Sequence, residues 1–128
     1  MSDPPIRIIA LGCDELAALA DPGAREFLVG DEDRPFRGFV VQANGRLRAY
    51  ANVCPHKQHP LNFDGDDFLV PGQCLLRCAS HGALFDPESG LCVFGPCSGR
   101  TLKALPCGVD RDGLWVELPP EAPAGQPS

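Results

Sequence analysis

The sequence has little positive charge, few histidines and no long apolar run. Its 128 residues include 11 lysines and arginines against 17 aspartates and glutamates, which gives a formal net charge of −6. Nucleic acids and anionic membranes attract basic surfaces, so this charge argues against both as partners. No stretch approaches the roughly 18 apolar residues that span a bilayer. The run from Ile8 to Leu11 is too short for an export signal. We therefore expect a cytoplasmic protein that binds neither nucleic acid nor membrane.

Cysteine, by contrast, is plentiful. The seven cysteines are an odd number, and a reducing compartment keeps thiols free of disulfides. Cysteines at defined spacings in such a compartment indicate a metal site more than disulfide bonds. Two of the seven belong to the motifs described below. The other five, Cys13, Cys74, Cys92, Cys97 and Cys107, are expected to be small buried apolar residues.

The pattern of short apolar pieces and turns predicts an all-β fold. Glycine and proline number 14 each, which suits many short strands joined by tight turns. The clearest signal is a hairpin with strands at 37–43 and 46–51. Its turn, Asn44-Gly45, readily takes the positive φ angles of a two-residue type I′ turn. A second hairpin is predicted from Cys107–Val109 and Leu114–Leu118, joined through residues 110–113.

The remaining predicted elements are short. They are an opening strand from Ile6 to Ala10, a helical turn from Glu15 to Ala20 with Asp14 as N-cap, a strand from Arg25 to Val29, and apolar pieces at 68–70, 75–76 and 83–85. Phe85 and Trp115 are expected in the core. Residues 1–118 are predicted to form a single domain. Residues 119–128 are rich in proline and predicted to form a flexible tail.

Two cysteine–histidine pairs provide the strongest chemical signal. One residue separates Cys54 from His56, and two residues separate Cys78 from His81. Two loops that each carry one thiolate and one imidazole would together offer two sulfur and two nitrogen ligands. This donor set suits zinc or an iron–sulfur cluster with mixed ligation. The residues by themselves leave both metals open.

The residues around these pairs resemble a known family. The order Cys-x-His, then Cys-x-x-His, followed by Gly82, Phe85-Asp86 and Gly90, closely resembles the Rieske [2Fe–2S] domain. The resemblance continues through Gly95-Pro96 and residues 102–106 and extends to about residue 118. A zinc finger would more often place two cysteines before two histidines. The resemblance implies an all-β Rieske-like domain of small antiparallel sheets with two cluster-binding loops.

The resemblance also implies the ligands and their surroundings. Cys54 and Cys78 would bind one iron, and His56 and His81 the other, in one [2Fe–2S] cluster per chain. The Gly95-Pro96 segment would be the loop that covers the cluster. The third histidine, His59, would be a surface residue near it. The separation between His56 and Cys78 is longer than is usual in the family, with the surplus expected at residues 62–73.

Four positions near the ligands imply a low reduction potential. High-potential relatives join the two loops by a disulfide, but His59 and Ser80 stand at the two positions here. The same relatives carry a serine and a tyrosine whose hydroxyls donate to the cluster, whereas this sequence has Ala83 and Phe85. Fewer donors stabilise the reduced cluster less. We therefore expect a potential near the bottom of the Rieske range, around −150 mV.

The histidine count limits the functions that the resemblance permits. A Rieske oxygenase needs a second iron bound by two further histidines and a carboxylate, and only His59 is left for it. We therefore predict a soluble one-electron carrier, a Rieske-type ferredoxin rather than an enzyme. It would pass electrons from a reductase to a terminal oxygenase or another oxidoreductase. Two alternatives stay open: a small Rieske subunit of a larger reductase, similar to that of nitrite reductase, and a cluster sensor or zinc-stabilised structural module.

Overall fold

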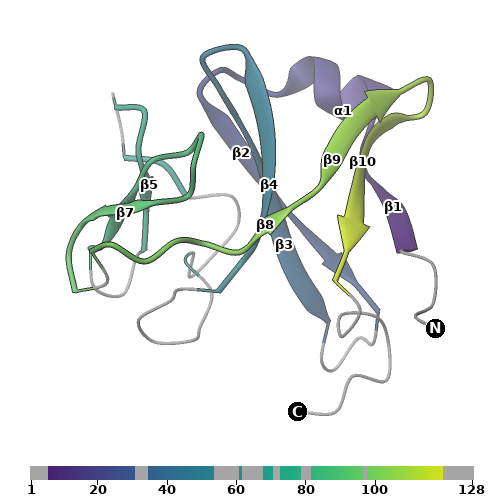
Figure 1. Ribbon diagram of the computed structural model, residues 1–128. Helices are drawn as coiled ribbons and strands as arrows, with labels where there is room; N and C mark the ends of the chain where they lie inside the picture. The colour runs from purple at the N-terminus through teal and green to yellow at the C-terminus, as the bar shows by residue number, and fades with distance from the viewer. Residues whose placement is uncertain are drawn as a thin grey trace.

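The structure, a computed structural model, describes residues 6–30, 35–53, 61, 68–70, 73–78, 82–96 and 98–119. These residues form ten strands and one short helix, and they confirm the predicted all-β class (Figure 1). In chain order the elements are β1 (Ile6–Gly12), α1 (Cys13–Ala18), β2 (Gly23–Val29), β3 (Phe36–Ala43), β4 (Arg46–Ala51), β5 (Leu76–Arg77), β6 (Leu84–Phe85), β7 (Cys92–Phe94), β8 (Ala104–Leu105), β9 (Cys107–Asp110) and β10 (Gly113–Leu118). Within this described part, no helix is long and apolar enough to cross a membrane.

The strands form three antiparallel sheets. Their strand orders are β1-β10-β9, β2-β3-β4-β8 and β5-β6-β7. In Figure 1 the four-stranded sheet lies in the middle, the β1-β10-β9 sheet on one side of it and the β5-β6-β7 sheet on the other. The small β5-β6-β7 sheet carries the second predicted ligand loop. The four-stranded sheet therefore lies between the β1-β10-β9 sheet and the sheet that carries this predicted loop.

Strand β3 explains this arrangement because it faces two cores. Phe39 and Val41 belong to an apolar cluster that reaches the β5-β6-β7 sheet. Val40, between them, belongs to a second cluster shared with β1 and β10. Side chains alternate between the two faces of a strand, so a continuous apolar run serves a strand that is covered on both sides. We call these groups the cluster-side core and the base core.

The β3–β4 hairpin turns at Asn44 and Gly45, as predicted. Their φ angles are 54° and 77°, the positive values that a type I′ turn requires. The Asp21 carboxylate accepts hydrogen bonds from both turn amides, at 2.9 and 2.7 Å. The Asn44 side-chain amide donates to the Glu88 carboxylate at 2.9 Å. The hairpin tip thus links the turn before β2 to the β6–β7 connection.

Two sequence predictions about these elements need correction, and two strands were not predicted. Helix α1 begins after Gly12, so Asp14 lies in its first turn and is not the N-cap. The Glu15 carboxylate accepts a hydrogen bond from the backbone amide of Gly12 at 3.0 Å. This is the bond of a capping box in which the third helical residue reaches back to the N-cap. Strands β7 and β8 have three and two residues, too few for a periodic signal, and unlike β5 and β6 they do not coincide with a predicted apolar piece. Trp115 is half-buried at the surface, where the Arg7 guanidinium lies 4.1 Å from its ring centre.

Tyr50 provides a test of how the cluster-side core is built. Its hydroxyl donates to the Pro87 carbonyl at 2.8 Å, and burial raises its pKa from 10.0 to about 12. The unfolded chain loses this proton near pH 10, so the stability due to Tyr50 is complete below pH 10 and falls as the pH approaches 12. We expect Tyr50→Phe to cost about 1–3 kcal/mol at pH 8, because a buried carbonyl loses its partner. Urea unfolding should show that the difference in free energy of unfolding between the two proteins is smaller at pH 11 than at pH 8. A difference that stays constant would contradict the raised pKa of Tyr50.

Candidate metal centre

The second predicted ligand loop begins and ends in a hairpin. Cys78 follows β5 directly, and its amide donates to the Ala83 carbonyl at 2.9 Å. The Gly82 amide in turn donates to the Cys78 carbonyl at 2.9 Å. Gly82 has a φ of 72°, which favours glycine over residues with a side chain. The chain therefore leaves the β5-β6-β7 sheet at Cys78 and rejoins it at Ala83, which fixes both ends of the segment that contains His81.

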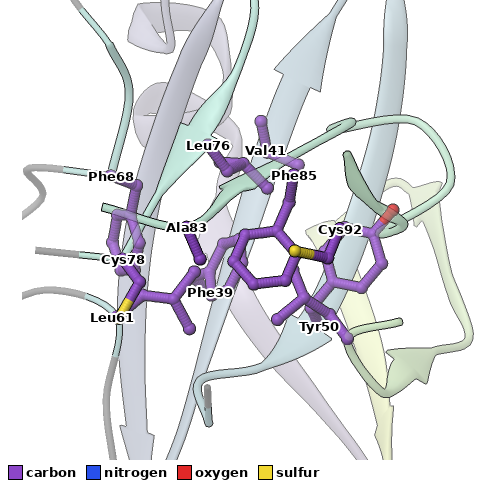
Figure 2. Packing of buried hydrophobic residues seen from close by; sticks show 11 residues of the cluster. Phe39, Val41, Tyr50, Leu61, Phe68, Leu76, Cys78, Ala83, Phe85 and Cys92 are labelled. Carbon is purple, nitrogen blue, oxygen red and sulfur yellow. The ribbon is translucent and has the colours of Figure 1, made fainter. Parts of the chain in front are cut away.

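Cys78 has no solvent exposure and lies at one end of the cluster-side core. Figure 2 shows it near Leu61 and Phe68, with Tyr50 and Cys92 at the other end of this core. Phe68 stacks on Phe39 with ring centres 4.5 Å apart. A thiolate in such an apolar place is costly unless a cation compensates its charge. This place is compatible with a thiolate whose charge a bound iron would compensate.

The glycine–proline loop packs on the second ligand loop. Gly95 has a φ of 110°, and a Cβ placed on it would lie 2.8 Å from the Ala83 Cα. The Gly95 carbonyl accepts the Ser98 amide at 3.1 Å and the Ser98 hydroxyl at 2.9 Å. Glycine is thus required where this loop meets the residue that closes the ligand hairpin. The resemblance implied that Gly95-Pro96 covers the cluster, and this role stays a prediction.

The first predicted ligand loop is visible at its two ends. Val53 precedes it, and its amide donates to the Ala51 carbonyl at 3.0 Å. Leu61 follows it and is fully buried in the cluster-side core. The predicted ligands Cys54, His56 and His81, and the predicted non-ligand His59, lie outside the described residues. Cys78 is the one predicted ligand that the structure describes, so the set of four stays a prediction.

A polar network at the base of the first ligand loop was not found from the sequence. Asn52 is 1% exposed, and its amide nitrogen donates to the Glu26 carboxylate at 2.8 Å. Its amide oxygen accepts the Leu61 amide at 2.8 Å. Arg37 donates to the same Glu26 oxygen at 2.6 Å. A polar residue two positions before Cys54 was the available signal, but its partners come from distant parts of the chain.

The other cysteines follow the prediction in part. Cys92 is buried, and its thiol donates to the Phe94 carbonyl at 3.3 Å. Cys74 and Cys107 are half-buried, and burial raises the pKa of both thiols. Cys13 is exposed, contrary to the prediction, because it begins α1 at the surface and its thiol donates to the Arg111 carbonyl. Cys97 lies outside the described residues.

The described residues thus place a buried cysteine at the start of a short hairpin, with a glycine–proline loop packed against Ala83, on a β-domain. Its predicted donors, two thiolates and two imidazoles, fit a [2Fe–2S] cluster with mixed ligation. The Rieske [2Fe–2S] domain family matches residues 15–107, which is most of the chain. The chain belongs to this family, and its cofactor is a [2Fe–2S] cluster.

Solved structures show the same fold. The ferredoxin of carbazole 1,9a-dioxygenase from Nocardioides aromaticivorans IC177 is 20% identical, with a TM-score of 0.59 over 94% of this chain and 99% of that one. A Sphingomonas yanoikuyae B1 ferredoxin is 19% identical, with a TM-score of 0.61 over 89% of this chain and 100% of that one. A 2-oxoquinoline 8-monooxygenase component is also 19% identical, with a TM-score of 0.64, but the match covers 86% of this chain and 25% of that one. Among curated protein sequences, none matches.

Proposed function

We propose that this protein is a one-electron carrier that passes electrons from a reductase to a terminal oxygenase or another oxidoreductase. The observation that carries the proposal is the extent of the structural match. The fold covers 99% and 100% of two ferredoxin chains, but only about a quarter to a third of the oxygenase components. One matched structure is a complex of a reduced oxygenase with an oxidised ferredoxin. These likenesses support a ferredoxin role more than a catalytic one.

The chain's own residues would hold the cluster in a rigid cage. Cys54 and Cys78 would bind one iron, and His56 and His81 the other. When bound, the cluster supplies a single electron that is taken up and released with little change in its ligands. The buried position of Cys78 keeps water from its sulfur. The hydrogen-bonded ends of the second ligand loop hold the backbone in place while the charge changes by one.

The acidic composition supports a basic partner. The chain's formal charge of −6 favours proteins whose docking face is positive. Opposite charges accelerate encounter, and salt screens them within a Debye length of about 10 Å at 0.1 M. The partner's face should therefore be basic where it meets this protein, and encounter should be slower at high salt.

Rapid-mixing measurements test the proposal. We expect the reduced protein to transfer its electron to a Rieske oxygenase, and the second-order rate constant to fall roughly tenfold or more between about 0.02 M and 0.5 M salt. The visible spectrum of the purified protein should show a [2Fe–2S] cluster. A colourless protein that contains zinc would contradict the electron-carrier function. A rate constant that does not change with salt would contradict the basic partner face alone.

A further inference from the structure

The first ligand loop is closed at its base by one buried side chain. Asn52 follows β4, and its own amide donates to the Arg37 carbonyl on β3 at 2.9 Å. Its side chain then accepts the amide of Leu61, nine residues further along the chain. Among the described residues, Asn52 is the one buried side chain that carries an amide or a charged group. Buried polar groups in proteins are generally hydrogen-bonded, so the partners of Asn52 indicate what its side chain does.

The orientation of the Asn52 amide follows from two partners among the described residues. A carboxylate can only accept and a backbone N–H can only donate. The Asn52 nitrogen therefore faces Glu26, and its oxygen faces Leu61. The opposite orientation would place two acceptors together at one end and two donors at the other. Glu26 thus aims the amide oxygen at the end of the ligand loop.

Arg37 keeps Glu26 in place for this task. The Glu26 side chain is 14% exposed, so its charge is largely removed from water. Arg37, from the neighbouring strand, donates to the same carboxylate oxygen that accepts from Asn52. An opposite charge at this distance stabilises the ionised carboxylate. The order of support runs from Arg37 to Glu26 and then to Asn52.

The end of the loop is in turn attached to the core beneath the second ligand loop. Leu61 is fully buried, and Figure 2 shows it beside Cys78 at the same end of the cluster-side core. The loop from Val53 to residue 60 contains the predicted ligands Cys54 and His56. Asn52 therefore fixes the separation between the start of this loop and the core that holds Cys78. The two ligand pairs must keep one relative position to share a cluster.

We propose that Asn52 is a positioning residue for the [2Fe–2S] cluster, held in its working orientation by Glu26 and Arg37. The inference rests on the proposed cluster ligands, but not on the identity of any electron partner. Residues that orient metal ligands typically alter metal affinity by 10–100-fold when changed. The bonds of Asn52 to Glu26 and Leu61 would act on the cluster through the geometry of the loop.

An exchange of acid and amide between positions 52 and 26 tests the inference. Asn52→Asp keeps the acceptor for Leu61 but places a second carboxylate against Glu26. We expect about tenfold or faster loss of the cluster to an iron chelator, and altered g values in the reduced protein, while far-UV circular dichroism keeps the strand signal. Adding Glu26→Gln places an amide at position 26. Its nitrogen can donate to the carboxylate at position 52, and its oxygen can accept from Arg37. The double variant should recover the wild-type g values and chelator resistance.

One control separates positioning from general stability. Tyr50→Phe removes a buried hydrogen bond elsewhere in the same core and should leave the g values unchanged. Wild-type g values and chelator resistance in Asn52→Asp would overturn the inference, and so would a double variant that does not recover. Either result would leave the electron-carrier function intact, whereas a wild-type protein without a cluster would overturn that function first.

Discussion

Replacing Cys78 by alanine should give a colourless protein that has lost its iron and much of its resistance to unfolding. Cys78 is fully buried where the second ligand loop begins, and metal binding to such loops is coupled to folding. The packing loss from removing one sulfur atom is small by comparison, of the order of 1 kcal/mol. His81→Ala should have the same effect on the cluster. Iron and sulfide analysis with thermal unfolding would measure both changes.

Two matched variants show whether this loss is due to the metal. Cys92→Ala also removes one buried sulfur atom from the cluster-side core, but at a residue that is not a predicted ligand. His59→Ala removes an imidazole three positions after His56 in the sequence. Both should keep full iron content and the wild-type visible spectrum. A cluster lost from the His59 variant and retained in the His81 variant would show that the ligand assignment is wrong.

The second large effect concerns the reduction potential, which should lie near −150 mV, the lower end of the Rieske range. Ala83 and Phe85 offer no side-chain hydroxyl at the positions where high-potential relatives donate to the cluster. A hydrogen bond to a charged group is worth about 1.5–3 kcal/mol. For one electron, about 59 mV corresponds to ~1.4 kcal/mol. Ala83→Ser with Phe85→Tyr should therefore raise the potential by roughly 130–260 mV.

Voltammetry of the purified proteins measures this directly. Both positions are fully buried, so added hydroxyls there have little access to water and need partners inside the protein. Phe94→Tyr provides a control, because Phe94 is 64% exposed on β7 and its added hydroxyl would face solvent. The potential of that variant should stay at the wild-type value. A wild-type potential above about +100 mV would contradict the low-potential assignment.

The parts of the fold that could be predicted from the sequence are those with local signals. The Asn44-Gly45 turn and its flanking strands could be read from turn chemistry and the apolar pattern alone. The family was recognisable because the ligand types and spacings are set by the metal. The anchoring of the end of the first ligand loop could not be predicted from the sequence, because it depends on residues 26, 37, 52 and 61. Hydrogen bonds between such distant positions leave no pattern within any one segment.

The same reasoning explains the errors. Cys13 resembled the other cysteines in type, but its exposure depends on where α1 lies on the surface. Trp115 was expected in the core because tryptophan is large and apolar. Its neighbours Leu114 and Val116 fill the base core instead, since alternate residues of β10 face opposite sides. Tertiary packing, rather than residue type, decided both positions.

The position of Trp115 gives the molecule a built-in optical reporter. It is the single tryptophan in the sequence and lies on the β1-β10-β9 sheet, with Arg7 over its ring and Gly108 against its edge. The cluster is predicted in the loops at the other end of the molecule. Indole emission therefore follows the base sheet, while visible absorbance follows the ligand loops. Recording both signals in one denaturant titration would show whether the two ends of the protein unfold together or in sequence.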